Sequence, residues 1–187
     1  MGSEVSLAPS LLLSMPQLTD PNFNRTVVLL CKHFEEGAFG LIMNRPLLTD
    51  GRVVVNLDPP AESTGEIEVW VGGPVEPERS WILVGDDTPE TEGLGGMRVA
   101  EGMYLSTSPD LLRLLLEPEP PARTRLIVGY SGWGPGQLDA ELNASAWLIS
   151  DVDRDLIFNT PADDMWEAAI RRLGADPASL TMSRGVH

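Results

Sequence analysis

The sequence lacks the side chains from which most metal and nucleophilic sites are built. Its 187 residues include one cysteine, Cys31, and two histidines, His33 and His187. A single cysteine excludes an internal disulfide and a multi-cysteine zinc site, and it agrees with a reducing cytoplasm. Two histidines leave little material for a Ser-His-Asp triad or a multi-histidine metal site. We therefore predict a protein without a metal ion or a resident cofactor.

Clusters of glycine and aspartate do not complete a ligand-binding loop. Residues 93–96 are glycine-rich, but Arg98 stands where a dinucleotide loop needs its third glycine, and no Walker A sequence is present. Residues 151–155 copy the first half of a calcium loop, yet Leu156 occupies the position of its required glycine. We interpret these segments as exposed loops and turns.

Positive charge and long apolar runs are also scarce. The chain has 28 acidic and 13 basic residues, a formal net charge of -15, and Lys32 is its one lysine. Such a field repels the phosphates of nucleic acids and the headgroups of anionic membranes. The apolar runs fall far short of the roughly 20 residues of a membrane helix, and no signal peptide stands at the N-terminus. We predict a cytoplasmic protein that binds neither nucleic acid directly nor a membrane.

Hydrophobic periodicity and turn residues predict one domain over 1–187, with a core at about 10–174 and short flexible termini. At 42% hydrophobic, a chain of this length buries a core without staples. Strands are predicted at 9–16, 26–31, 40–43, 66–71, 81–84, 102–105, 125–128, 146–149 and 156–158, with a weaker candidate at 52–55. The strands at 26–31 and 40–43 are predicted to form a hairpin. Helices are predicted at 108–116, from about 137, and at 161–173. The last helix is predicted to be capped by Thr160, to end at Gly174, and to bury Met165, Trp166, Ala169, Ile170 and Leu173. This succession indicates an α+β domain.

Residues 129–142, which we call the elbow, combine a strand end, a glycine-rich bend and a helix start. Three glycines and a proline at 132–136 predict a sharp break of the strand. The backbone N–H groups of Ser131, Gly132 and their neighbours would favour an anion or a polar ligand at the helix start. Trp133 stands in the bend, and Gln137 and Glu141 are neighbours on the helix. An ordinary solvated helix face is the alternative interpretation.

Two further residue pairs carry candidate chemistry. Asn44 and Arg45 precede Pro46, which predicts that both side chains lie at the rim of the sheet. The guanidinium of Arg45 suits a carboxylate, a phosphate or the backbone of a partner, although a capped strand end is the simpler interpretation. Cys31 and His33 are two residues apart, which predicts that they share one face of a strand. We favour packing over a nucleophilic role for this pair.

Four motifs, in this order, resemble the bacterial AlgH/YqgE family. They lie at residues 13–27, 40–46, 72–75 and 129–141, and the resemblance extends over about 10–174. It implies a mixed, largely antiparallel bifurcated sheet, partly barrel-like, flanked by about three helices. It also implies a cytoplasmic bacterial protein of a kind sometimes described as a transcriptional regulator. The sequence itself shows no helix-turn-helix pattern and no basic recognition face.

Three functions remain open from the sequence. We favour a non-catalytic ligand- or protein-binding regulatory module that takes an unknown protein partner or a small polar or anionic ligand. Its candidate binding residues are Asn44, Arg45, Gly72, Gly73, Ser131, Gly132, Trp133, Gln137 and Glu141. The alternative is a hydrolase or transferase with Glu141 as general base and Ser131 or a water as nucleophile, which requires a buried Glu141. The third is a subunit whose acidic surface docks a basic partner.

Overall fold

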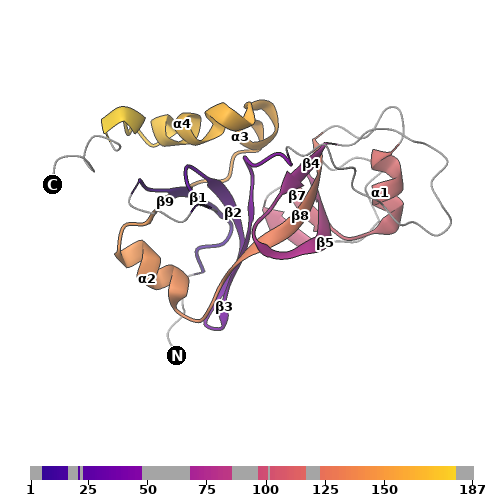
Figure 1. Ribbon diagram of the computed structural model, residues 1–187, viewed down its shortest axis with the longest axis horizontal. Coiled ribbons are helices and arrows are strands. Elements are labelled where there is room, and N and C mark those ends of the chain that lie inside the picture. Colours follow the sequence, from indigo (N-terminus) through magenta and orange to yellow (C-terminus); the bar gives the residue numbers. More distant parts are fainter. Residues whose placement is uncertain are drawn as a thin grey trace.

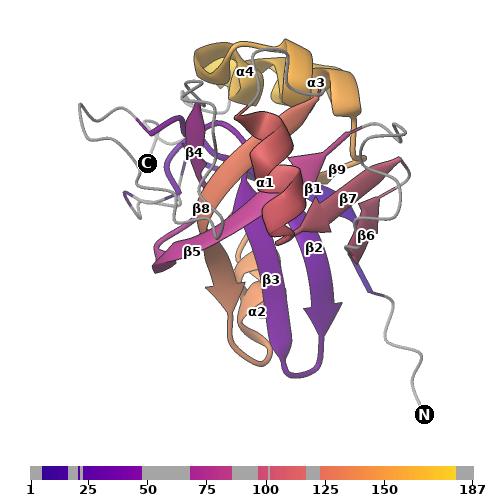
Figure 2. The same cartoon turned by 90° about the vertical axis from the view of Figure 1, so that its right-hand side faces the viewer.

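The computed structural model describes residues 6–16, 21, 23–47, 68–85, 97–100, 102–116 and 123–179. Figures 1 and 2 show how its helices and strands are arranged. The strands are β1 (Ser10–Ser14), β2 (Val27–Phe34), β3 (Gly37–Ile42), β4 (Val69–Val71), β5 (Val75–Val84), β6 (Met97–Ala100), β7 (Met103–Ser106), β8 (Thr124–Trp133) and β9 (Trp147–Ser150). The helices are α1 (Pro109–Leu115), α2 (Gln137–Asn143), α3 (Arg154–Asn159) and α4 (Ala162–Arg172). The predicted strand at 52–55 lies outside the described residues.

One long strand, β8, belongs to both halves of the sheet. Its C-terminal part pairs with β3, where Gly132 lies opposite Phe39. Its N-terminal part lies between β4 and β5, where Ile127 is opposite Trp70 on one side and Trp81 on the other. The sheet continues from β3 through β2 and β1 to β9, and from β5 through β7 to β6. Apart from the parallel β4–β8 pair, the strand pairs are antiparallel, so the predicted α+β fold with a bifurcated sheet is confirmed.

Side chains of β1 and β2 point alternately to opposite faces of the sheet and pack in two separate hydrophobic cores. Leu11 and Leu29 face the larger core, whereas Leu12 and Val28 face the smaller one. Helices α3 and α4 cover the side of the larger core, and α2 packs on the opposite side (Figure 1). The larger core also includes Val99 of β6, although the strand order runs from β6 at one edge to β9 at the other, so the sheet is open and not the partly barrel-like one that the resemblance implies.

Residues 156–158 form part of α3, so the strand predicted there is wrong. The side chain of Asp153 accepts a hydrogen bond from the backbone N–H of Leu156 at 3.1 Å and caps the helix. Asp155 adds a carboxylate to the first turn. The period of a three-residue apolar run fits a helix and a strand equally well. The acidic residues at 151–155 are predicted to form a turn, whereas Asp153 among them caps the helix.

The buried stripe of α4 and the end of the helix are largely as predicted, but its N-terminal cap is not. Met165, Trp166, Ala169 and Ile170 are buried, whereas Leu173 is exposed. The residue before the helix is Pro161, and no side chain caps it, so the predicted cap by Thr160 is wrong. Gly174, with a φ of 82°, ends the helix as predicted.

Strand β8 continues through Gly129, where the predicted strand had ended, and through Gly132, the first glycine of the predicted break. The bend therefore follows Trp133, within 134–136, and not Gly132. At Gly129 the backbone φ is 74°, and an added Cβ would lie 2.4 Å from the carbonyl oxygen of Gly73. Glycine is required there because β8 passes between the two halves of the sheet at this point. Two further differences concern strand bounds: β5 begins at Val75, and β6 was not predicted.

Candidate functional site

Predicted motifs meet where β3, residues 72–73 and β8 come together. The backbone N–H of Ile42 and the hydroxyl of Ser131 both donate to the carbonyl of Gly72, at 2.8 and 3.0 Å. An added Cβ at Gly73 would lie 2.2 Å from the carbonyl group of Tyr130. Gly72, Gly73 and Ser131 are therefore brought together by close packing of backbone against backbone.

Asn44 and Arg45 hold the turn before β2. The Asn44 side chain is buried; its Oδ1 accepts from the backbone N–H of Val27 and its Nδ2 donates to the carbonyl of Arg25, both at 3.0 Å. The predicted rim position of Asn44 is therefore wrong, because its amide replaces strand hydrogen bonds inside the protein. Arg45 donates to the carbonyl of Asn24, and partial burial lowers its pKa. A cavity of about 220 Å³ is lined by Pro21, Ile42, Arg45, Pro46, Val71, Gly73 and Pro74.

Glu141 accepts hydrogen bonds from three side chains behind the bend. Its Oε1 accepts from the indole nitrogens of Trp133, at 3.3 Å, and Trp147, at 3.0 Å. Its Oε2 accepts from Nε2 of Gln137 at 3.2 Å, which confirms that these two residues are neighbours on the helix. The ring of Phe23 packs against both indoles. Glu141 thus fixes α2 to β8 and β9.

The bend also satisfies its own polar groups. The backbone N–H of Gly134 donates to Oε1 of Gln137 at 2.9 Å, so one N–H expected to meet a ligand is used inside the elbow. Gly132 is exposed within the β3–β8 pair. In the part of the chain that the structure describes, no hydrogen bond joins Ser131 to Glu141. A ligand site at these residues stays a prediction.

A β-bulge in β2 turns Cys31 and His33 to opposite faces. The pairing of β2 with β3 shifts register just before Lys32. Cys31 lies in the larger core, where burial raises its pKa to about 12. His33 accepts from the backbone N–H of Leu7 at 3.2 Å, and its Nε2 is 3.4 Å from Asp139 of α2. The predicted shared face is wrong, and the bulge leaves Lys32 beside the larger core instead.

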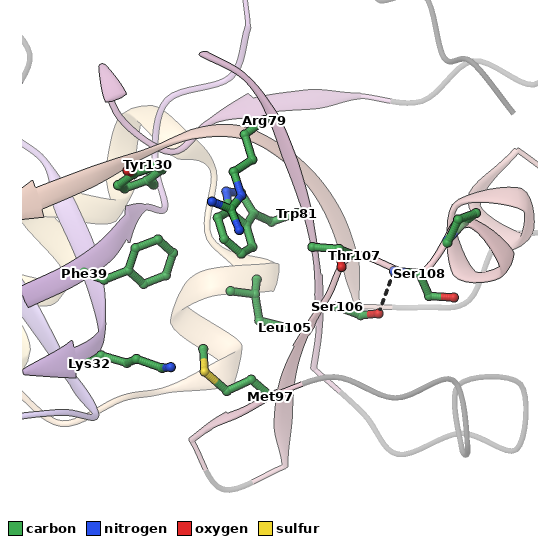
Figure 3. A pocket seen from close by; sticks show the side chains of 11 residues that line it. Lys32, Phe39, Arg79, Trp81, Met97, Leu105, Ser106, Thr107, Ser108 and Tyr130 are labelled. Carbon is green, nitrogen blue, oxygen red and sulfur yellow. Dashed lines mark hydrogen bonds between the residues drawn. The ribbon is translucent and has the colours of Figure 1, made fainter. Parts of the chain in front are cut away.

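An open cavity of about 690 Å³ borders the larger core between the two halves of the sheet (Figure 3). We call it the aromatic cavity. Its lining residues are Lys32, Phe39, Arg79, Trp81, Met97, Leu105, Ser106, Thr107, Ser108, Pro109 and Tyr130. The ring centroid of Phe39 is 5.1 Å from those of Trp81 and Tyr130, and the latter two rings are perpendicular at 6.3 Å.

Two cationic side chains accompany these rings. The guanidinium of Arg79 lies 4.4 Å from the ring centroid of Trp81, and its Nη1 is 3.7 Å from Glu76. Hydrogen bonding to Glu76 raises the pKa of Tyr130, because the carboxylate favours the protonated phenol. Lys32 extends toward Met97 and Leu105 in Figure 3. No carboxylate among the described residues forms an ion pair with Lys32.

The indole of Trp81 differs in its hydrogen bonding from the indoles of three other tryptophans. Its Nε1 is buried and has no hydrogen-bond partner within the described chain. The indole nitrogens of Trp133, Trp147 and Trp166 all donate to acceptors. A buried donor without an acceptor is uncommon in folded proteins and marks an incomplete arrangement of polar groups.

The residues that line the aromatic cavity are not among the candidate binding residues predicted from the sequence. Phe39, Trp81 and Tyr130 come from three strands that are far apart in the chain, so no spacing connects them. One available signal was Lys32, a single lysine in a strongly acidic chain. It directly follows the strand predicted at 26–31, and the prediction assigns it no role.

Neither a metal-ligating cluster nor a membrane-spanning helix occurs among the described residues. No group of three or more histidine, cysteine, aspartate or glutamate side chains there could hold a metal ion. None of the described helices is both long enough and apolar enough to cross a lipid bilayer.

Comparisons with known proteins agree with the sheet described above. A family model described as AlgH-like matches residues 11–178. A UPF0301 protein of Myxococcus xanthus is 42% identical over 186 residues, and one of Ruegeria pomeroyi is 40% identical over 185 residues; each comparison covers 97% of this chain and 99% of the relative. The solution structure of the AlgH protein from Pseudomonas aeruginosa matches with a TM-score of 0.71 and 30% identity, covering 97% of this chain and 96% of that chain.

A crystal structure of a Corynebacterium diphtheriae protein matches with a TM-score of 0.67 and 22% identity, covering 94% of this chain and 90% of that chain. At this identity the likeness concerns the fold alone. The family match and the bacterial relatives, in contrast, extend over nearly the whole sequence. The chain therefore belongs to the AlgH-like family, as the order of its four motifs predicts.

Proposed function

We propose that this AlgH-like protein is a non-catalytic binding module that takes a small ligand in the aromatic cavity. The observation that carries the proposal is an open cavity of about 690 Å³ that joins three aromatic rings to two cationic side chains. Ligand sites are concave, mostly apolar and roughly 300–1,000 Å³ in volume, with a few polar groups for orientation. The aromatic cavity meets each of these criteria.

Contacts within the elbow favour binding over hydrolysis. The Ser131 side chain is fully buried and its hydroxyl donates to Gly72, whereas a nucleophile must meet its substrate. Glu141 already accepts hydrogen bonds from two indoles and one amide, whereas a general base needs a lone pair within reach of the proton it removes. These groups stabilise the fold in their present geometry.

The proposed module acts in the cytoplasm, and it regulates through its ligand or a protein partner. A formal net charge of -15 opposes direct contact with DNA at physiological salt. A ligand in the cavity would contact both halves of the sheet, because Phe39 belongs to β3 and Trp81 to β5. A partner surface on either half could then respond to the ligand.

A thermal-shift screen of nucleotides, sugar phosphates and small organic acids tests the proposal. The wild type is compared with Met97→Trp, which fills part of the aromatic cavity, and with Arg45→Ala and Gln137→Ala at the sites predicted from sequence. Circular dichroism establishes that each variant is folded. A ligand that stabilises the wild type and both control variants, but not Met97→Trp, is the expected result.

Three other results would contradict the proposal. Loss of stabilisation in Arg45→Ala or Gln137→Ala, with Met97→Trp unaffected, would move the site to the residues predicted from sequence. Conversion of the ligand during incubation, followed by NMR, would replace binding with catalysis. If nothing in the screen stabilises the wild type, docking of a protein partner becomes the better explanation.

A further inference from the structure

We infer that the ligand of the aromatic cavity is a small organic anion with a flat, unsaturated body. The inference rests on the proposed function, since it concerns the same cavity, and it specifies the charge and the shape that the cavity selects. Three features of the wall carry it: a cation without an ion-pair partner among the described residues, a cation that already occupies an aromatic face, and rings that line the cavity.

The charge preference comes from Lys32 and Arg79. Arg79 has Glu76 as a partner at 3.7 Å, so its charge is partly compensated. Lys32 forms no ion pair within the described residues, and its side chain points toward Met97 and Leu105 (Figure 3). Its exposed ammonium group lies 6.0 Å from the ring centroid of Phe34 and keeps donors for an anion, with which it can form a charge-assisted hydrogen bond. The chain as a whole carries a formal net charge of -15, so two cationic side chains on the wall of one cavity form a local exception that favours an anion.

A cationic ligand fits the cavity poorly although aromatic rings line it. Cages of aromatic rings bind ammonium groups through the negative faces of the rings. In this cavity the guanidinium of Arg79 already lies over Trp81 at 4.4 Å. A second cation would meet the charges of Arg79 and Lys32, so the cage is blocked for that class of ligand.

The rings of Phe39 and Tyr130 define the shape of the ligand. Their centroids are 5.1 Å apart and their planes are tilted by 44°, which leaves ring surface facing the cavity in Figure 3. A flat conjugated body packs against such rings in stacked or edge-to-face geometry, and it loses little conformational entropy on binding. A body of this kind, with its anionic group directed to Lys32, satisfies the apolar and the charged walls together.

Three probes of one shape and three charges test the inference: 2-naphthoate, 2-naphthamide and 2-naphthylmethylammonium. Binding is followed in ¹H–¹⁵N spectra through the indole signals, and the signal of Trp81 is assigned by its loss in Trp81→Phe. A fragment of this size is expected to bind with a Kd of roughly 1 mM. We expect naphthoate to bind about tenfold more tightly than the amide, to shift the Trp81 signal selectively, and the ammonium probe to bind least.

Exchange of single charges gives the matched controls. Lys32 and Arg171 are both exposed, and Arg171 lies on α4, outside the lining of the cavity. Lys32→Gln is expected to weaken naphthoate binding about tenfold and to leave the amide unchanged, because one charge-assisted hydrogen bond is lost. Arg171→Gln removes the same charge elsewhere and is expected to change neither affinity.

The possible outcomes separate this inference from the proposed function. If the three probes bind equally, or the ammonium probe binds best, the charge preference is wrong while the cavity remains a ligand site. If Lys32→Gln and Arg171→Gln weaken naphthoate equally, the effect is one of net charge and the role of Lys32 is wrong. If no probe shifts the Trp81 signal at millimolar concentration, both the inference and the proposed cavity site are overturned.

Discussion

The elbow and the aromatic cavity use the same types of side chain, but they differ in how completely their polar groups are paired. In the elbow, Glu141 accepts from Trp133, Trp147 and Gln137. In the cavity, the buried indole nitrogen of Trp81 has no acceptor among the described residues. Ring contacts occur in both regions, so aromatic content does not separate them.

This difference separates a motif that specifies the fold from a region that is open to a ligand. The glycines and aromatic residues of the elbow meet strict packing demands, since β8 crosses between two half-sheets there. Close packing of this kind restricts many neighbouring positions to a few residue types, and the elbow therefore forms a dense sequence motif. The aromatic cavity carries no motif, because its residues come from separate strands and their contacts are long-range. The predictions below test the two regions in turn.

The largest effect is expected from Gly73→Ala in the close-packed region. An added Cβ would lie 2.2 Å from the Tyr130 carbonyl group and 2.5 Å from the backbone nitrogen of Ser131, and backbone atoms inside a strand cannot move aside as a flexible side chain can. We expect the free energy of unfolding to fall by about 4 kcal/mol or more. The matched control is Gly132→Ala, whose nearest contact would be an ordinary 3.6 Å and which should cost under about 1 kcal/mol. Urea denaturation of both variants measures the difference, and equal midpoints would show that the close approach relaxes freely.

A smaller loss is expected from Glu141→Leu. The change leaves the indole N–H groups of Trp133 and Trp147 without their acceptor inside the protein. With about 1–3 kcal/mol for each unsatisfied buried donor, we expect the free energy of unfolding to fall by about 3 kcal/mol. Glu141→Gln keeps one acceptor oxygen and should cost about 1 kcal/mol.

Binding measurements complete the test of Glu141. If the carboxylate serves the fold alone, any ligand found for the aromatic cavity should keep its affinity in Glu141→Gln. A variant of full stability that has lost ligand binding or turnover would instead make Glu141 a functional group, and the contrast between the two regions would fail.

Ser131→Ala is expected to cost about 1 kcal/mol, the usual net worth of one buried hydrogen bond. The Gly72 carbonyl keeps its bond from the backbone N–H of Ile42, so no buried acceptor is left without a partner. Stability is measured by denaturation and ligand affinity by thermal shift. If Ser131→Ala kept full stability but no longer converted a ligand, Ser131 would be a nucleophile. We expect instead a small loss of stability and an unchanged ligand affinity.

The sequence predicted those parts of the fold that depend on local patterns. The β2–β3 hairpin, the α2 neighbours Gln137 and Glu141, and the buried stripe of α4 all follow from period and turn residues. The short run at 156–158 was misassigned because three apolar residues fit a helix and a strand equally well. Asp153 was the informative residue, since its side chain caps the helix.

Long-range contacts lay beyond such patterns. Arg125 stands in a strand predicted to be apolar, yet its guanidinium donates to the carbonyls of Met43, at 2.6 Å, and Ile157, and lies 3.8 Å from the ring centroid of Trp70. Burial lowers its pKa to about 10. These partners are far apart in the chain, so only the folded sheet brings them together. The same holds for Lys32, whose entry into the cavity depends on a β-bulge that no residue type signalled.

The smallest effect is expected from Trp81→Phe. The change removes an indole nitrogen that has no acceptor to lose, at the edge of an open cavity, so the free energy of unfolding should change by under about 1 kcal/mol. Trp147→Phe removes a nitrogen bonded to Glu141 inside a packed core and should cost about 2 kcal/mol.

Because both changes also remove ring volume, each is combined with Glu141→Leu in a double-mutant cycle. A coupling of about 1 kcal/mol is expected for Trp147 and none for Trp81. A loss in Trp81→Phe as large as that in Trp147→Phe would mean that the Trp81 indole is already paired, and the cavity would then be as complete as the elbow.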